Sequence, residues 1–222
     1  MKIWIASADV DEISDCSWAP LEGIITNPSV LIRAGRDWKS TLRTLAESDW
    51  SGLRALEAIH LQAVSRDRDG ILGEMECFAQ LIQPKRLIAK VPVGPGGFAA
   101  TPALIAQDME VNVTGICSLS QAQVAIQAGA RFVSVYVARV NDASRHGDGG
   151  FRLVADVREY IGRCGVDAQI MAASIRDQTQ YEEIVRRGAH AVAATPQLIR
   201  QIVQDELTEQ SMAAFQNDWE NG

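Results

Sequence analysis

The chain has 222 residues, of which 47% are hydrophobic and 22% charged, the composition of an ordinary globular protein with room for a sizeable core. This length fits one domain better than two. The 28 acidic and 21 basic residues give a net charge of −7 without a long run of like charge, which argues against a nucleic-acid-binding surface. We find neither a signal peptide nor an apolar stretch long enough to cross a membrane, and therefore expect a cytoplasmic protein.

Short apolar strands alternate with amphipathic helical segments along nearly the whole chain, the pattern of a parallel sheet built from βαβ units. Eight strands are predicted, at residues 3–6, 23–26, 58–64, 87–91, 111–116, 132–137, 168–173 and 190–194. Helices are predicted at residues 29–47 with a break at Gly35, 70–82, 97–108, 119–127, 151–163, 178–187 and 196–204. Eight strands, nearly all followed by a helix, predict an α/β fold, a single (β/α)8 or TIM barrel over residues 1–222.

Capping residues support these helix boundaries. Ser118 with Gln121 indicates a capping box, and Thr195 before Pro196 indicates an N-cap followed by proline at the first helical position. Gly129 and Gly188 follow two of the predicted helices, at the position where helices commonly end, and they support these helix ends.

Two segments leave alternatives open. The glycine-rich loop 146–150 is either a plain connection or a lid over an active site, and we favour the connection. An extra amphipathic helix at about residues 208–219 follows the last barrel helix, with Met212, Phe215 and Trp219 on one face. It either packs back across its own barrel or reaches a neighbouring subunit.

The four cysteines, Cys16, Cys77, Cys117 and Cys164, are far apart and lie in no CxxC or histidine-rich neighbourhood. We therefore expect no metal site. Buried free thiols in a reducing cytosol are the expected state of all four.

Lys90 lies in a short apolar strand that ends at Pro92 and reads as buried on both faces. Burial favours the neutral amine and lowers its pKa, which makes a nucleophile able to form a Schiff base with a carbonyl substrate. Only four of the 21 basic residues are lysines, so lysine is not general surface filler here. The alternatives are a lysine that extends to solvent from the strand end, or one that is paired with a buried carboxylate.

Polar residues occupy the last inward positions of strands three to six, and they are Gln62, Lys90, Thr114 and Tyr136. Two residues earlier, the same faces of three of these strands carry His60, Asn112 and Ser134. Because barrel active sites lie at the carboxyl ends of the strands, we expect the first set to converge on one cavity. Each residue alone has a structural explanation, and His60 is expected to be a core histidine rather than a catalyst.

A second group of residues has the charge and position expected for binding an anionic group at one end of the substrate. Arg139 follows strand six, and Ser174 and Arg176 follow strand seven directly before a helix. Phosphate sites in such barrels often use arginines and a helix N-terminus in this region. The alternative is that Arg139 pairs with Asp142, that Arg176 pairs with Asp177, and that Ser174 is only a helix cap.

Six collinear motifs cover nearly the whole chain: GIITNPS at 23–29, AKVPV at 89–93, NVT at 112–114, YVAR at 136–139, AASIR at 172–176 and FQNDW at 215–219. Together they resemble the transaldolase family and, within it, the small fructose-6-phosphate aldolase branch. The TNPS and KVP pair is the specific part of the match. Glutamine at position 62 and tyrosine at 136, where true transaldolases usually carry glutamate and phenylalanine, resemble the aldolase branch.

The resemblance implies the roles of the site residues. Lys90 would form the Schiff base, while Gln62, Thr114 and Tyr136 would hold the water that relays protons. The implied substrate-binding residues are Asn27 for a hydroxyl, Asn112 in the NVT motif, and Arg139, Ser174 and Arg176 for phosphate. No cofactor is implied. The C-terminal segment resembles the family's helix that reaches a neighbour, which implies a homo-oligomer, a pentamer or decamer.

Ala6 departs from the family pattern, in which the first strand ends in an aspartate that contacts substrate hydroxyls and assists proton transfer. A methyl group can neither accept a hydrogen bond nor move a proton. We expect Asp9 to cap the following segment rather than to replace that aspartate. Because Tyr136 and its water retain a route for protons, we expect altered substrate choice more than lost chemistry.

The leading hypothesis is a metal-independent class I aldolase of carbohydrate metabolism, in the area of the pentose phosphate pathway, acting on a dihydroxyacetone-type donor and a phosphorylated aldehyde. The resemblance thus implies a small carbonyl substrate, a sugar phosphate. A transaldolase, or a relative with another carbonyl substrate, is the alternative among enzymes. A catalytically silent barrel that binds a phosphorylated metabolite is the alternative from another class.

Overall fold

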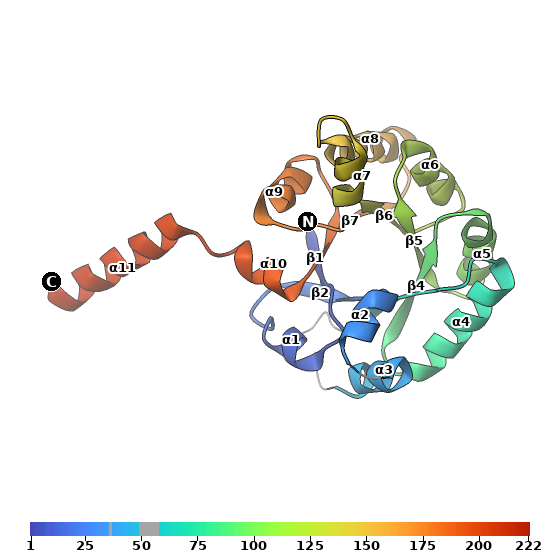
Figure 1. Cartoon of the computed structure of the whole chain (residues 1–222), viewed down its shortest axis with the longest axis horizontal. Helices are drawn as coiled ribbons and strands as arrows, with labels where there is room; N and C mark the ends of the chain where they lie inside the picture. The colour runs from blue at the N-terminus through green and yellow to red at the C-terminus, as the bar shows by residue number, and fades with distance from the viewer. Residues whose placement is uncertain (36, 49–57) are drawn as a thin grey trace.

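The strands form a closed barrel in the computed structural model, which describes residues 1–35, 37–48 and 58–222 (Figure 1). Neighbours in the sequence are parallel neighbours in the sheet, and β1 closes the barrel by pairing with β8. The strands are β1 (Lys2–Ile5), β2 (Leu21–Ile25), β3 (Ala58–Gln62), β4 (Arg86–Pro92), β5 (Glu110–Ile116), β6 (Phe132–Tyr136), β7 (Gln169–Ala173) and β8 (Ala191–Ala194). The predicted TIM barrel is therefore confirmed.

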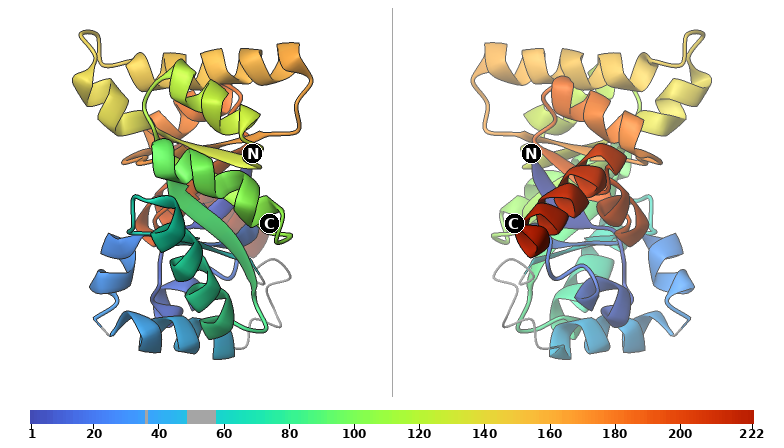
Figure 2. Two further views of the ribbon diagram at one scale, coloured as in Figure 1. Left: turned by 90° about the vertical axis from the view of Figure 1, so that its right-hand side faces the viewer. Right: turned by 90° about the vertical axis from the view of Figure 1, so that its left-hand side faces the viewer.

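Helices surround the barrel on its outer side (Figure 1, Figure 2). Those in the described residues are α1 (Val10–Ser14), α2 (Pro28–Arg33), α3 (Trp38–Glu47), α4 (Arg68–Leu81), α5 (Pro95–Ile105), α6 (Leu119–Gln127), α7 (Val137–Ala143), α8 (Gly149–Cys164), α9 (Gln178–Arg186), α10 (Pro196–Gln201) and α11 (Glu206–Asn221). None of the described helices is long and apolar enough to cross a membrane.

The structure corrects several predicted boundaries. The strand predicted at 58–64 ends at Gln62, because the Val64 amide donates to the Glu74 carboxylate instead of to a strand. The strand predicted to reach Val137 ends at Tyr136, where α7 begins. Helices α1 and α7 were not predicted, since a helix of five or seven residues is too short to show a helical period. The predicted break at Gly35 separates α2 from α3, and this glycine has a φ of +72°.

The predicted helix caps are present. The Ser118 hydroxyl accepts from the Gln121 amide, and the Thr195 hydroxyl accepts from the Leu198 amide with Pro196 at the start of α10. The Gln121 side chain, however, accepts from the Cys117 amide rather than from Ser118, so the box is displaced by one residue. Gly129 and Gly188 have positive φ values of 97° and 78° just after α6 and α9.

The barrel has a filled interior and a separate outer layer between strands and helices. The interior cluster, which lies beneath the site described below, is formed by Trp4, Ile25, Ala58, Ile88, Phe132, Met171 and Ala191. Gly23 makes room for its largest member, because a Cβ at that position would collide with the Trp4 ring and with the Ala58 carbonyl. This packed cluster closes the barrel interior below the carboxyl ends of the strands.

The C-terminal helix α11 projects away from the barrel (Figure 1). None of its residues is buried, and Trp219 is 89% exposed. The alternative in which this helix packs back across its own barrel is therefore wrong in this structure. Loop 146–150 runs from the connection after α7 into the first residues of α8.

The expectation of four buried thiols is correct only in part. Cys16 is buried and Cys77 is half-buried, but Cys117 and Cys164 are exposed. All four thiols are free. Cys117 comes after the end of β5 and Cys164 is the last residue of α8, and both places open to solvent.

Candidate active site

A cavity of about 180 Å³, here called the Lys90 cavity, opens at the carboxyl ends of the strands. Six strands or the loops directly after them contribute to it. Its lining consists of Ala6, Ile25, Thr26, Asn27, Val30, Arg33, Lys90, Tyr136, Arg139, Ala173, Ser174, Ile175, Ala193 and Thr195. It is the position expected for the active site of a TIM barrel.

Lys90 lies on the floor of this cavity and is only 4% exposed. Its Nζ donates to the Thr26 carbonyl oxygen at 2.9 Å. That carbonyl belongs to a fixed segment, because the Thr26 amide and hydroxyl both donate to the His60 carbonyl at 3.0 Å. Burial lowers the pKa of Lys90 from 10.5 to about 7, and no carboxylate among the described residues opposes this shift. The alternatives of a solvent-directed lysine or a lysine paired with a buried carboxylate do not fit this environment.

The other three residues predicted for the catalytic set lie beside Lys90. Gln62 is the register partner of Lys90 on β3, and its buried Oε1 has no hydrogen-bond partner among the described residues. The Thr114 hydroxyl donates to the Tyr136 phenol oxygen at 3.5 Å, a long contact. Tyr136 lines the cavity, whereas Gln62 and Thr114 stand next to the lining. Gln62 is thus next to Lys90 on the neighbouring strand, and Tyr136, bonded to Thr114, lines the same cavity as the amine.

Beneath this level, a chain of hydrogen bonds crosses the barrel interior. Asn112 Nδ2 and His60 Nδ1 are 3.1 Å apart, and the Ser134 hydroxyl donates to Asn112 Oδ1 at 2.8 Å. The His60 ring packs edge-on against Trp4 and Phe132, with centroids 4.3 and 5.1 Å away. Burial, together with the charges of Lys90 and Arg86, lowers the pKa of His60 well below 6.5, so it stays neutral.

This arrangement fits the expectation that His60 is a core histidine. It also places Asn112 below the cavity rather than on its lining, with its amide engaged on both sides. Its predicted contact with substrate therefore has no direct support in the geometry. The amide instead ties β3, β5 and β6 together under the lysine.

Arg139 and Ser174 lie together at one side of the cavity. Arg139 projects from α7 over the Tyr136 ring, with Cζ 4.8 Å from the centroid, and no carboxylate pairs with it in the described part of the chain. Ser174 has a φ of +63°, a conformation that costs free energy in a residue other than glycine and clusters at functional sites. The N-cap of α9 is Asp177, so Ser174 is not merely a cap.

Arg176 is directed away from the cavity. Its guanidinium donates to both carboxylate oxygens of Asp142, at 2.9 and 2.5 Å, and this bond holds the pKa of Asp142 below its usual value. The alternative pairings, Arg139 with Asp142 and Arg176 with Asp177, are therefore wrong. Of the three residues predicted for phosphate, the structure brings Arg139 and Ser174 to the cavity but not Arg176.

Asn27 reaches the cavity from the start of α2. Its Oδ1 caps the helix by accepting from the Val30 amide at 3.0 Å, which leaves the amide NH2 for a ligand. Arg33, which was not predicted from the sequence, lines the same cavity from the end of α2. The sequence did contain an indication of this position, because residues 27, 30 and 33 fall on one face of a helix that begins at Pro28.

Ala6 lies where the first strand ends, and it lines the cavity with its methyl group. Asp9 caps α1, and its carboxylate accepts from the amides of Asp11 and Glu12 at 2.9 and 3.1 Å. It does not line the Lys90 cavity. The expectation that Asp9 is a cap is confirmed, and the carboxylate missing at position 6 has no replacement on the cavity lining.

The fold and the cavity define a class, the TIM-barrel proteins whose ligand site lies at the carboxyl ends of the strands. A family model described as transaldolase/fructose-6-phosphate aldolase matches residues 3–221, and the chain belongs to this family. The resemblance inferred from the six motifs is thereby confirmed at the level of the family.

Two curated relatives match this chain over nearly their whole length. A probable transaldolase of Symbiobacterium thermophilum is 35% identical over 221 residues, covering 99% of this chain and 97% of the relative. A probable transaldolase of Brevibacillus brevis is 32% identical over 220 residues, covering 99% and 98%. A solved chain from a cube-shaped, highly porous protein cage designed by fusing symmetric oligomeric domains has a TM-score of 0.63, 9% identity, and coverage of 98% and 76%. At that identity the last likeness shows the fold alone.

Proposed function

We propose that this chain is a class I aldolase that uses Lys90 to form a Schiff base with a dihydroxyacetone-type donor. The observation that carries this proposal is the Lys90 amine itself, which is buried, has no counter-charge in the described part of the chain and has a pKa of about 7. Near neutral pH a large share of such amines is unprotonated and nucleophilic. A lysine that served only to fill space would destabilise the fold at this position, where an apolar side chain would not.

The proposed steps follow from the geometry. The Lys90 nitrogen adds to the donor ketone, water leaves, and the resulting iminium makes the adjacent carbon acidic. Tyr136, with a water held by Gln62 and Thr114, takes a proton from that carbon to form the enamine. The enamine carbon then bonds to the aldehyde carbon of the acceptor, the new alkoxide is protonated, and water releases the product from the lysine.

The acceptor is placed by the groups on the α7 side of the cavity. Arg139 and Ser174 offer a guanidinium and a hydroxyl for a phosphate on the aldehyde, as in glyceraldehyde 3-phosphate. Asn27 offers its free amide NH2 to a donor hydroxyl. Arg176 takes part only if its bond to Asp142 opens.

Borohydride reduction in the presence of dihydroxyacetone tests the lysine directly. We expect one reduced adduct per chain, located at Lys90 by peptide mass spectrometry, and none in Lys90→Met. Labelling at Lys39 or Lys85 instead would sink the assignment. Phosphate-ester binding that survives in Lys90→Met, without any reducible adduct in the wild type, would point to the silent binding barrel.

A transaldolase is the second candidate, favoured by the names of the curated relatives. Cleavage of fructose 6-phosphate with and without erythrose 4-phosphate separates the two. Release of free dihydroxyacetone at the same rate in both cases supports the aldolase. Turnover that requires the acceptor supports the transferase.

Ala6 gives the substrate question its own test. In Ala6→Asp, a carboxylate enters the cavity next to the donor. If the reading of this position is correct, Ala6→Asp gains activity on sugar phosphates such as fructose 6-phosphate. No gain in that variant would tell against it.

We further propose that residues 1–222 form one domain and that the chain assembles into a homo-oligomer through α11. Leu207, Met212, Phe215 and Trp219 leave large apolar side chains exposed along this helix. A neighbouring subunit that covers them would remove that surface from water.

A further inference from the structure

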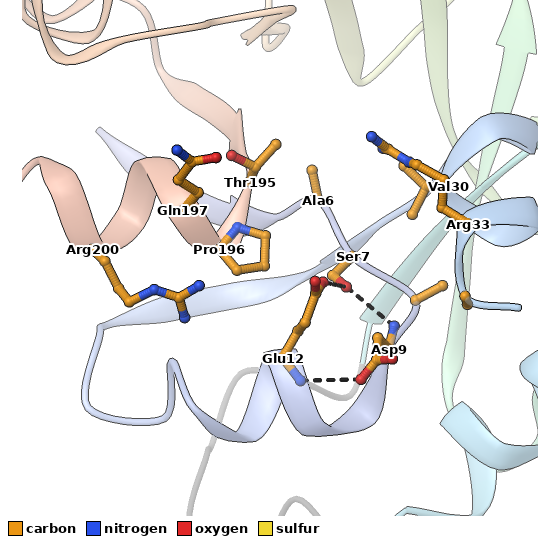
Figure 3. Close-up of a pocket in the computed structure, with 12 residues that line it drawn as sticks. Ala6, Ser7, Asp9, Glu12, Val30, Arg33, Thr195, Pro196, Gln197 and Arg200 are labelled. Carbon is orange, nitrogen blue, oxygen red and sulfur yellow. Dashed lines mark hydrogen bonds between the residues drawn. The ribbon is translucent and has the colours of Figure 1, made fainter.

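A second cavity adjoins the Lys90 cavity on the side of β1 and β8. It has a volume of about 430 Å³, and we call it the Arg200 cavity because Arg200 lines it. The two cavities share four lining residues, and these are Ala6, Val30, Arg33 and Thr195. Figure 3 shows the Ala6 methyl group between Thr195 on one side and the Arg33 side chain on the other. Because no side chain longer than a methyl group stands at position 6, a ligand has a path between the cavities.

On the side of the Lys90 cavity, the charged side chains around this path are all positive. The residues that line the Lys90 cavity include Lys90, Arg33 and Arg139, and its described lining contains no aspartate or glutamate. The Arg200 cavity contains Asp9 and Glu12, but both carboxylates are already engaged. Asp9 caps α1, and Glu12 accepts from the Ser7 hydroxyl at 2.6 Å.

Arg33 lines both cavities, and the Asp9 and Glu12 carboxylates that share the Arg200 cavity accept hydrogen bonds from other groups of the chain. In the described part of the chain Arg33 forms no ion pair, and its side chain extends from α2 along the rim of the cavities (Figure 3). Arg139 reaches the Lys90 cavity from a different element, α7. One cavity that holds an amine and is bordered by two separate arginines suits a ligand with an anionic group at each end.

We propose that Arg33 determines donor specificity, by binding an anionic group, a phosphate or a carboxylate, on the half of the substrate that is attached to Lys90. This inference rests on the proposed function, in which Arg139 and Ser174 take the acceptor and so leave the Ala6 side for the donor. The donor class is then a ketone with an anionic end rather than neutral dihydroxyacetone. The adjoining Arg200 cavity supplies the room that the larger group needs.

The test measures the donor concentration that gives half-maximal borohydride trapping at Lys90. Dihydroxyacetone phosphate is compared with dihydroxyacetone, and pyruvate with acetone, so that the two pairs differ by a phosphate and by a carboxylate. We expect the wild type to favour the anionic member of at least one pair by about tenfold, the scale of one charge-assisted bond. Arg33→Met should abolish this preference without changing the values for the neutral donors, and Arg33→Lys should restore part of it.

A matched variant makes the result specific. Arg43→Met removes one positive charge from α3, at a position that lines neither cavity, and should leave the preference intact. Equal trapping of neutral and anionic donors by the wild type, or a preference that survives in Arg33→Met, would overturn the inference while the Schiff base stands.

Failure of the proposed function itself has a different signature, which is no adduct at Lys90 with any donor. In that case, equilibrium binding of dihydroxyacetone phosphate and of pyruvate to Lys90→Met, with and without Arg33→Met, decides the question for Arg33. A loss of affinity of about tenfold on removing the guanidinium supports the anion site. Unchanged affinity for both refutes it.

Discussion

At the scale of single residues, the site depends on Lys90, whose charged form is destabilised by burial. Lys90 has a backbone carbonyl as its hydrogen-bond partner and, within residues 1–35, 37–48 and 58–222, no carboxylate nearby, so burial depresses its pKa. The neutral His60 below it adds no opposing charge. The lysine can therefore alternate between ammonium and amine near pH 7, as a nucleophile must.

The pH dependence of adduct formation follows from this pKa. Only the neutral amine attacks a ketone, so the initial rate of borohydride-trapped adduct should rise with pH and level off, with a midpoint near the Lys90 pKa of about 7. Rates measured from pH 5.5 to 9.5 with dihydroxyacetone give the profile. Lys90→Met should show no adduct at any pH. A midpoint near 10 would mean that the amine is not desolvated in solution.

The two arginines predicted to bind phosphate should differ in effect. Arg139→Met removes a guanidinium on the cavity lining and should raise the KM for a phosphorylated aldehyde by about tenfold or more. Arg176 already satisfies Asp142, so Arg176→Met should change KM by less than about threefold. Steady-state kinetics with glyceraldehyde 3-phosphate and with unphosphorylated glyceraldehyde provide the comparison. Equal effects of both substitutions would contradict the geometry described above.

At the scale of secondary structure, strand register and short helices place the site. The register pairs Gln62 with Lys90 and Lys90 with Asn112 across β3, β4 and β5. That these side chains face the barrel interior follows from the alternation along each strand, and it was predictable. The positions of Arg33 and Arg139 depend on α2 and α7, short helices whose direction no periodic pattern reveals.

Helix α11 is the element whose surface calls for a partner. We expect Phe215→Glu with Trp219→Glu to convert an oligomer into a monomer, because charges would replace the apolar groups that a neighbour covers. Sedimentation velocity of the wild type and the variant checks this. Far-ultraviolet circular dichroism should be nearly unchanged, since α11 contributes no buried residue to the barrel. A wild-type chain that sediments as a monomer would refute assembly through this helix.

At the scale of the whole molecule, burying Lys90 lowers the free energy of unfolding of the barrel. The pKa of Lys90 falls from 10.5 in the unfolded chain to about 7 in the folded barrel. Between these values the unfolded state binds more protons than the folded state, so this group makes stability rise with pH. Its cost is greatest at and below pH 7 and disappears above about pH 10.5.

Lys90→Met should therefore stabilise the barrel. We expect its free energy of unfolding to exceed that of the wild type by a few kcal/mol at pH 7, an order-of-magnitude value that includes the lost bond to Thr26. The difference should shrink as pH rises toward 10. Urea unfolding of both proteins at pH 7 and 9.5 provides the double difference, in which other titrating groups cancel. A variant less stable than the wild type at pH 7 would show that the amine is well solvated.

The sequence by itself determined the alternation of strands and helices, the eightfold count, the family motifs and the central lysine. These are local properties, because alternation and caps are set by residues a few positions apart. That Lys90 and Gln62 both face the barrel interior also follows, once a barrel is assumed.

Which residues share the cavity depends on how the chain packs in three dimensions. In the folded chain Arg176 is bonded to Asp142, Asn112 lies below the site, and Arg33 lies at the rim of the cavity. These three positions depend on contacts between segments far apart in the chain. The tertiary structure also leaves α11 projecting from the barrel and joins a second cavity to that of Lys90 beside Ala6. Helix direction and the choice among competing charged partners arise from packing, which no single stretch of sequence encodes.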